Sequence, residues 1–237
     1  MGLLSFGSRV LKNVGKIGTR IKAEANRLGQ KVSRALQSKP PTHELGAEDE
    51  TKFMANLSNQ AYIEPNKRVN VDGFELDDEL SDLKTAVYHH PTKKETYVSY
   101  RGTADADDLM TDSKITQGKH RGDHQFIDAE NKFEKAQKKY GKVSGVTGHS
   151  LGGTKTQHIS KKYNVKGHAF NAGTGIDETY IKDSIRCKLP RPPKFCDKLT
   201  SHKVQGDPIS YLSGGYGKKK TYKTKKPYLN HSLSNWL

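Results

Sequence analysis

The sequence has 237 residues, of which 32% are hydrophobic, and its formal net charge is +15. This length fits one main domain with appendages. No stretch approaches the ~18 to 20 uninterrupted apolar residues of a membrane span, and basic residues interrupt the first apolar run before it could serve as a signal peptide. We therefore expect neither a membrane span nor a secretory leader.

Two basic segments carry most of the net charge. Residues 1–37 contribute +7, and six lysines between residues 218 and 226 contribute +6, which leaves +2 for the rest of the chain. The remainder is therefore a near-neutral globular body. Local basic patches of this kind imply an anionic partner, either phospholipid head groups or nucleic acid.

Residues 1–37 predict a basic amphipathic helix. Apolar residues recur at steps of three and four, at Val10, Val14, Ile17, Ile21, Ala25, Leu28, Val32 and Leu36. Their period of about 3.67 residues keeps the apolar stripe almost straight, which suits a flat surface such as a membrane. A helix docked on its own domain or on a partner protein, a solvated basic tail and a nucleic-acid arm are the alternatives. Residues 38–46, which contain Pro40-Pro41, are predicted to be a linker.

Strands and helices alternate after the linker. Acidic residues followed by helical apolar spacing predict a helix over 47–63. Strand-like runs over 85–89 and 96–101 predict a hairpin, and a helix over 126–140 precedes further strands over 165–170 and 202–205. This order predicts a mostly parallel sheet covered by helices on both faces. In such a sheet, active residues gather at the carboxyl ends of the strands.

The stretch from Val143 to Gly153 has the pattern of a nucleophile elbow. A β-favouring run leads into Gly148-His149-Ser150-Leu151-Gly152, and a helix is predicted over 154–163. Glycines at 148 and 152 remove the Cβ atoms that would block so tight a turn. We expect a strained backbone that projects the hydroxyl of Ser150 into a cleft.

A serine hydroxyl needs a neighbouring imidazole to take its proton and a carboxylate to orient that imidazole. Asp207 follows a predicted strand and His231 lies in the terminal segment, so Ser150, Asp207 and His231 have the chain order of an α/β-hydrolase triad. Asp177, Asp183 and Asp197 are alternative acids, and His202 is an alternative base. His149 is expected to pack, whereas His158 and His168 precede every acid that could complete such a triad.

Four motifs in this order resemble the class 3 (fungal-type) lipase family of α/β-hydrolases. They are Tyr100-Arg101-Gly102-Thr103 with the acidic run that follows it, Gly148 to Gly153, Gly206-Asp207-Pro208-Ile209, and His231. The resemblance covers roughly residues 47–237, which are therefore expected to form a lipase-like domain. Residues 104–112 take the place of the family's lid, and Asn171-Ala172-Gly173 stands where the family often has a Gly-x-Pro turn.

The resemblance implies a role for each matched residue. Ser150 would be the nucleophile, Asp207 the orienting acid and His231 the base, and Thr103 with the backbone N–H of Leu151 would form the oxyanion hole. The implied activity is hydrolysis of carboxylic esters of lipids, as a lipase or phospholipase, with no cofactor and no metal. The rival interpretations are a non-lipid esterase or thioesterase, and a catalytically silent structural or interaction protein of a virus particle.

Two further segments carry predictions. Residues 216–226 interleave tyrosines and lysines, and because they lie between Asp207 and His231 we expect a loop beside the active site. This loop would attract phospholipid head groups, bind nucleic acid or be merely solvated. Cys187 and Cys196 flank a Pro-rich stretch and are expected to be free thiols, with a small disulfide as the alternative. The expected location is cytoplasmic, at a membrane surface, or inside a virus particle.

Overall fold

The computed structural model describes residues 47–103, 124–173, 178–211, 216–223 and 231–237. The predicted amphipathic helix over 1–37, the linker over 38–46 and the acidic run over 104–112 lie outside these ranges. The predicted division of the chain at residue 47 therefore stays a prediction.

The described residues form a seven-stranded sheet in which the strands follow one another in chain order. The first three strands pair antiparallel, and from β3 to β7 every pair is parallel. The strands are β1 (Glu75–Leu76), β2 (Thr85–His90), β3 (Glu95–Tyr100), β4 (Gly145–His149), β5 (Lys166–Phe170), β6 (Leu199–Val204) and β7 (Lys218–Tyr222). The hairpin and the mostly parallel sheet are thus as predicted.

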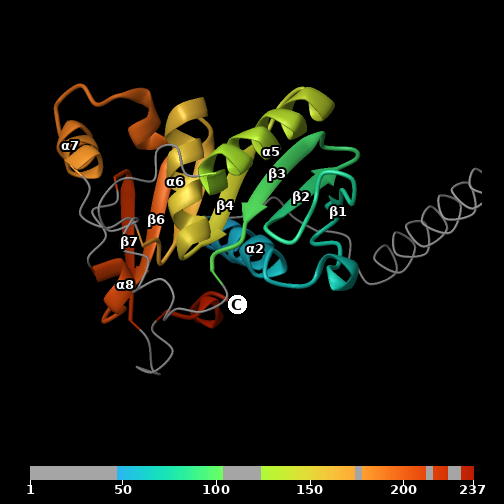
Figure 1. The fold of residues 1–237 in the computed structure, drawn as a ribbon. Coiled ribbons are helices and arrows are strands. Elements are labelled where there is room, and N and C mark those ends of the chain that lie inside the picture. The colour runs from blue at the N-terminus through green and yellow to red at the C-terminus, as the bar shows by residue number, and fades with distance from the viewer. Residues whose placement is uncertain (1–46, 104–123, 174–177, 212–215, 224–230) are drawn as a thin grey trace, which may run out of the picture.

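Helices cover both faces of this sheet (Figure 1). α2 (Ala47–Gln60) lies on one face, and α5 (His124–Tyr140) and α6 (Leu151–Tyr163) lie on the other. The shorter elements are η1 (Pro65–Lys67), α7 (Glu178–Arg186), η2 (Lys194–Asp197), α8 (Pro208–Tyr211) and η4 (Leu233–Asn235). The predicted architecture, a mostly parallel sheet covered by helices on both faces, is confirmed. Among the helices of the described ranges, none combines the length and hydropathy that crossing a membrane would take.

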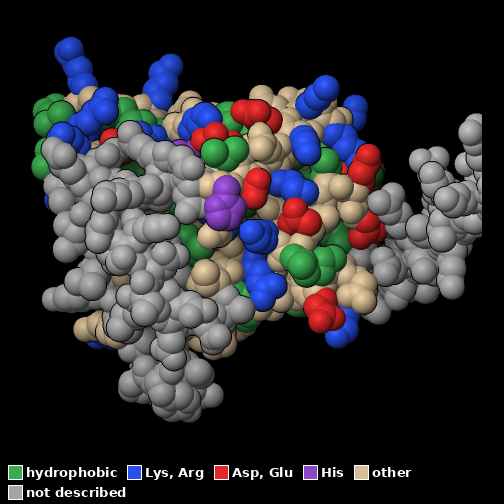
Figure 2. Space-filling model, in the orientation of Figure 1, with side chains coloured by type: hydrophobic (Ala, Val, Ile, Leu, Met, Phe, Trp, Pro, Cys, Tyr) green, Lys and Arg blue, Asp and Glu red, His purple; other side chains and the backbone are tan. Residues whose placement is uncertain are grey.

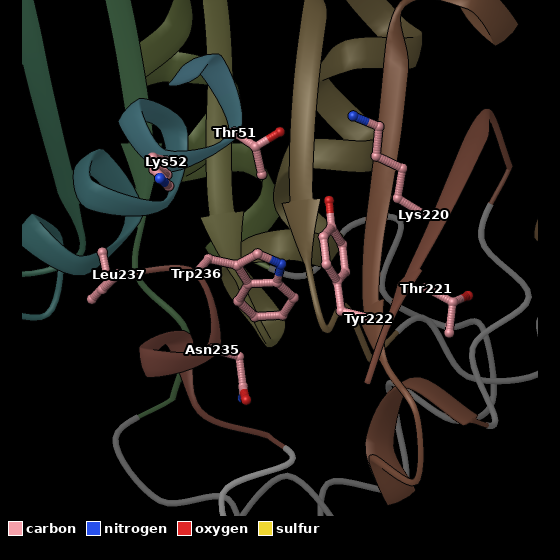
Figure 3. Close-up of a pocket in the computed structure, with 8 residues that line it drawn as sticks. All are labelled: Thr51, Lys52, Lys220, Thr221, Tyr222, Asn235, Trp236 and Leu237. Carbon is pink, nitrogen blue, oxygen red and sulfur yellow. The ribbon is translucent and has the colours of Figure 1, made fainter. Parts of the chain in front are cut away.

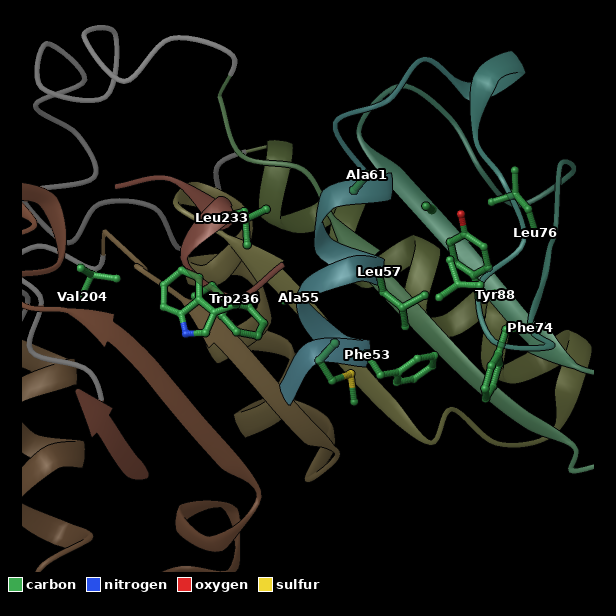
Figure 4. Packing of buried hydrophobic residues seen from close by; sticks show 14 residues of the cluster. Phe53, Ala55, Leu57, Ala61, Phe74, Leu76, Tyr88, Val204, Leu233 and Trp236 are labelled. Carbon is green, nitrogen blue, oxygen red and sulfur yellow. The ribbon is translucent and has the colours of Figure 1, made fainter. Parts of the chain in front are cut away.

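The α2 face holds the largest cluster of buried apolar side chains (Figure 4). Phe53 and Leu57 of α2 pack in the same cluster as Phe74, which follows η1. Leu233 and Trp236, from the last residues of the chain, belong to this cluster too and are 6% and 5% exposed. Leu233 and Trp236 therefore hold the C-terminal segment, which contains His231, against the core.

Residues 218–222 form the edge strand β7, so the predicted loop is wrong for this part of the segment. Three consecutive lysines have low β propensity, which is why the sequence did not indicate a strand. Lysines are nevertheless suited to an edge strand, because their charge prevents pairing with another sheet edge. Tyr222 supplies the apolar contact that holds the strand, since its ring packs against the α2-face cluster.

Cys187 and Cys196 form a disulfide, so the expectation of free thiols is wrong. The chain turns back after α7, and η2 brings the two Cα atoms to 5.5 Å from each other. The two cysteines are nine residues apart in the sequence, and this spacing alone does not show that the chain folds back to bring them together.

Charges of both signs mix on the face that α5 and α6 cover. Figure 2 shows Lys/Arg and Asp/Glu side chains interspersed over this face. An example is Lys132 of α5, which lies 2.9 Å from Asp82. Where Figure 2 shows the described residues of this face, neither sign forms a broad field, in agreement with a near-neutral body.

Candidate active site

Ser150 occupies a strained turn between β4 and α6. Its φ of 57° and ψ of −125° lie in a region that side-chain-bearing residues rarely adopt. A Cβ on Gly152 would lie 2.0 Å from the carbonyl oxygen of Tyr100, and one on Gly148 would lie 2.4 Å from the carbonyl oxygen of Gly152. The two glycines therefore let β4 and α6 press against the end of β3, as the elbow pattern predicts.

The structure brings Ser150, His231 and Asp207 into one chain of contacts. The Nε2 atom of His231 lies 3.0 Å from Oγ of Ser150, and its Nδ1 atom lies 3.0 Å from Oδ1 of Asp207. Both distances are within hydrogen-bonding range. The three side chains come from the turn after β4, the turn after β6 and the C-terminal segment, at the carboxyl end of the sheet.

Asp207 is fully buried and sits at the start of α8. Its two carboxylate oxygens accept hydrogen bonds from the backbone N–H groups of Ile209 and Ser210, at 3.2 and 3.0 Å. Burial alone would raise the pKa of Asp207, but the hydrogen bonds from His231 and Ser210 outweigh it and hold this pKa below its ordinary value. The carboxylate therefore stays ionised, and its contact with Nδ1 leaves Nε2 of His231 to face Ser150.

The predicted oxyanion-hole residues are Thr103 and Leu151, and Leu151 directly follows Ser150. Thr103 follows Gly102, where an added Cβ would lie 3.1 Å from Cβ of Ser150. The Oγ1 atom of Thr103 is buried and makes no hydrogen bond within the described residues. Leu151 begins α6, where a backbone N–H lacks an acceptor inside the helix. The role of these two groups as an oxyanion hole stays a prediction.

A second set of contacts supports the site, and the sequence did not indicate it. The hydroxyl of Tyr62, just after α2, lies 2.9 Å from Nδ1 of His149 and accepts a hydrogen bond from the N–H of Gly102 at 3.2 Å. The Nε2 atom of His149 lies 2.5 Å from the carbonyl oxygen of His231. Tyr62 and His149 thus join the segment that leads to Thr103 with the segment that carries His231.

The protonation states of Tyr62 and His149 follow from their burial. Burial, followed by the nearby imidazole of His231, lowers the pKa of His149 to about 3, so its ring is neutral. A carbonyl oxygen can only accept, so Nε2 of His149 carries the proton and Nδ1 accepts from Tyr62. Burial raises the pKa of Tyr62 to about 12, against the lowering effects of the Gly102 N–H and Arg101, which keeps its hydroxyl protonated and able to donate.

The alternative triad members lie elsewhere. Asp183 is buried in an ion pair with Lys161, and Asp197 is exposed in η2. His202 lies 2.9 Å from the hydroxyl of Tyr222 and 3.0 Å from Nδ1 of His168, on the α2 face. His158 contacts Glu130 of α5 at 2.7 Å. Asp177 is outside the described residues.

A metal-binding arrangement is not found in the described part of the chain. There, no group of three or more His, Cys, Asp and Glu side chains is placed to hold a metal ion.

Comparison with protein families identifies the chain. Residues 51–226 match a phospholipase-like family, by its model of the Tle-like phospholipase domain. The chain belongs to this family. The match includes Ser150 and Asp207 and ends before His231. It confirms the predicted class of protein, a lipase- or phospholipase-like hydrolase of lipid esters.

Solved fungal lipases have similar structures at low sequence identity. The Lip2 lipase of Yarrowia lipolytica is 19% identical with a TM-score of 0.49, over 84% of this chain and 86% of that one. The mono- and diacylglycerol lipase of Aspergillus oryzae is 15% identical with a TM-score of 0.49, over 78% and 82%. The lipase of Rhizomucor miehei, in a propeptide complex, is 12% identical with a TM-score of 0.49, over 76% and 70%. The sequence matches none of the curated proteins compared with it.

Proposed function

We propose that this phospholipase-like protein hydrolyses carboxylic esters of phospholipids by a Ser150-His231-Asp207 triad, at a membrane surface. The observation that carries the proposal is the contact of His231 with Ser150 on one ring nitrogen and with Asp207 on the other, each at 3.0 Å. The phospholipase-like family supports the substrate class.

The chemistry follows from the positions of these groups. Oγ of Ser150 attacks the acyl carbon as its proton passes to Nε2 of His231, and Asp207 stabilises the imidazolium that results. The N–H of Leu151 and the hydroxyl of Thr103 donate to the oxyanion, each worth about 3 kcal/mol. His231 then returns the proton to the departing alcohol, and a water molecule hydrolyses the acyl-serine by the same steps in reverse order.

Two basic regions support the membrane surface as the place of reaction. Residues 1–37 combine a net charge of +7 with an apolar stripe, which is the composition of a helix that lies in an interface. Lys218, Lys219 and Lys220 are exposed on β7, whose carboxyl end is at the same edge of the sheet as Ser150. Nucleic acid remains the alternative anion for both regions.

The test measures fatty acid released from phospholipid vesicles, from a triacylglycerol emulsion and from a soluble short-chain ester. We expect release from phospholipid above all, its loss in Ser150→Ala, and a fall of about 10⁴-fold in Asp207→Asn. Ser144→Ala, at the other end of β4, is the matched control and should retain activity.

Each other outcome contradicts a part of the proposal. Turnover of the soluble ester alone would indicate a non-lipid esterase or thioesterase. Near-normal activity of Ser150→Ala would reject the nucleophile. Absence of any turnover by the intact protein would favour the silent structural protein.

A further inference from the structure

The short helix α8 determines where the carboxylate of Asp207 lies. This carboxylate accepts hydrogen bonds from the N–H groups of Ile209 and Ser210, at 3.2 and 3.0 Å, so its place depends on the place of these two amides. Both amides belong to α8, which has only four residues. The last four carbonyl oxygens of a helix lack a partner inside it, so α8 needs hydrogen-bond donors from elsewhere.

Lys203 of β6 supplies such a donor. Its Nζ atom donates to the carbonyl oxygen of Ser210 at 2.8 Å. Ser210 is 1% exposed, and a buried carbonyl group without a donor costs free energy. A hydrogen bond from a charged donor is about twice as strong as one between neutral groups. Ser210 is thus held by Lys203 through its carbonyl oxygen and by Asp207 through its N–H.

The strand that carries Lys203 is held on both edges. Lys203 pairs with Thr221 of β7, and β6 also pairs with β5. Figure 3, a close-up of the pocket between α2, β7 and the C-terminal segment, shows Lys220 and Tyr222 pointing toward α2 and Thr221 pointing away from it. Successive side chains of a strand point to opposite faces, and paired residues share a face, so Lys203 lies on the face away from α2. Lys203 therefore joins α8 to a fixed strand of the sheet.

The charge of Lys203 depends on pH. Burial, and after it the ammonium group of Lys219 on β7, lower the pKa of Lys203 to about 8, although the carboxylate of Asp207 raises it. Burial and then Lys188 lower the pKa of Lys219 itself. Below its pKa Lys203 is an ammonium, and above it Lys203 is a neutral amine that donates a weaker hydrogen bond.

We propose that Lys203 is a positioning residue, which holds Asp207 in place for His231 by binding the carbonyl oxygen of Ser210. Loss of this contact frees Ser210 to move, together with the amide from which Asp207 accepts. Oδ1 of Asp207 then leaves its place 3.0 Å from Nδ1 of His231, and His231 is less well oriented as a base. The inference rests on the proposed function, because the place of Asp207 affects turnover only if the triad is catalytic.

Steady-state kinetics on a soluble short-chain ester test this role. Lys203→Met removes the donor and should lower kcat by about 10- to 100-fold with little change in KM, because small displacements of a catalytic group cost that much. Lys203→Arg keeps a charged donor and should restore most of this kcat. Lys198→Met, the same change at an exposed lysine just before β6, is the matched control and should keep full kcat. Thermal unfolding checks that each variant is folded.

The pH dependence of kcat separates Lys203 from a merely structural contact. As pH rises through about 8, Lys203 loses its proton, and kcat should fall. The fall should disappear in Lys203→Arg, whose guanidinium stays charged, and move to higher pH in Lys219→Gln, which removes the ammonium that lowers the pKa of Lys203. A level kcat across this range, an equal fall in Lys203→Arg, or loss of the fall in Lys219→Gln would overturn the proposal.

A spectrum that needs no turnover keeps this test apart from that of the proposed function. The proton NMR signal of the Nδ1–H group of His231, identified by its absence in His231→Gln, reports on the hydrogen bond to Asp207. It should shift or broaden in Lys203→Met and stay in place in Lys203→Arg and Lys198→Met. If it does so while the intact protein turns over no ester, the proposed function fails and the positioning of Asp207 stands. An unchanged signal with full kcat in Lys203→Met would overturn the proposal and leave the proposed function intact.

Discussion

At the scale of single residues, Tyr62 joins the parts of the active site that come from different strands. Its hydroxyl accepts from the N–H of Gly102 and donates to His149, whose other nitrogen contacts the carbonyl oxygen of His231. The backbone of the proposed base is thereby tied to the segment that leads to Thr103. Tyr62 touches none of the reacting atoms in this arrangement and is therefore a positioning residue.

Tyr62→Phe should lower turnover by up to ~10²-fold, because a shift of about 1 Å in a reacting group costs that much. The unsatisfied groups left behind should lower the free energy of unfolding by about 1–3 kcal/mol. Tyr97→Phe is the control, because the Tyr97 ring packs against Phe53 and Phe74 in the same cluster. The check is kcat and KM on a soluble ester. A rise in KM with unchanged kcat would contradict a positioning role.

The sequence placed Ser150 at a glycine-flanked turn and Asp207 after a strand, and both are local patterns. The choice of His231 rested on its order in the chain and on the resemblance to lipases. The catalytic roles of all three stay a prediction. Tyr62 could not be found this way, since its contact with His149 spans 87 residues and depends on how α2 crosses the sheet. The disulfide of Cys187 with Cys196 likewise depends on a turn of the chain that no local pattern shows.

At the scale of elements, alternation of strands and helices predicted the sheet, whereas β7 was missed. Its lysines disfavour a strand by propensity, whereas its pairing with β6 and the packing of Tyr222 against the α2-face cluster are tertiary contacts that the sequence does not show. Boundaries also shifted: α2 ends at Gln60 where the sequence predicted residue 63, and β6 begins at Leu199 where it predicted residue 202. Such shifts arise because packing, more than propensity, decides where an element ends.

Packing of α2 and the C-terminal segment over the sheet also buries three imidazoles, which makes stability depend on pH. Burial lowers the pKa of His149, His168 and His202. Below pH ~6.5 the unfolded chain binds protons on these rings while the folded chain does not. The free energy of unfolding is thus highest above this pH and falls with acidification, by up to about 1.4 kcal/mol per pH unit for each histidine.

Urea unfolding at pH 7.5 and pH 5 measures this dependence. His202→Phe should reduce the difference between the two values of the unfolding free energy, since it removes one titrating ring. His124→Gln, an exposed histidine at the start of α5, should leave the difference unchanged. The same pH dependence in His202→Phe and in the unaltered protein would show that His202 is not a buried neutral ring.

At the scale of the whole molecule, the predicted amphipathic segment and the hydrolase domain are expected to act separately, because a Pro-containing linker joins them. Deletion of residues 1–37 should abolish or sharply reduce binding to anionic liposomes, and each lost basic residue near the surface weakens it by ~1 kcal/mol. Turnover of a soluble short-chain ester should be unchanged. Flotation with liposomes, repeated with neutral lipid and with high salt, measures the first effect.

Three results would argue against an anchor. If the truncated protein bound liposomes as well as the intact protein, residues 1–37 would not be a membrane anchor. Loss of soluble-ester turnover would indicate a helix docked on the domain. Salt-dependent binding of DNA or RNA, lost on truncation while liposome binding persists, would indicate a nucleic-acid arm.

The central claim is that Ser150 is a nucleophile activated by His231, and covalent labelling tests it most directly. An alkyl fluorophosphonate reacts with such a serine by forming an O–P bond and releasing fluoride, while His231 takes the proton. Intact-mass and peptide mass spectrometry should find one adduct per chain, on Ser150, absent in Ser150→Ala and greatly slowed in His231→Gln. An unlabelled Ser150, or labelling at the same rate in His231→Gln, would contradict the account.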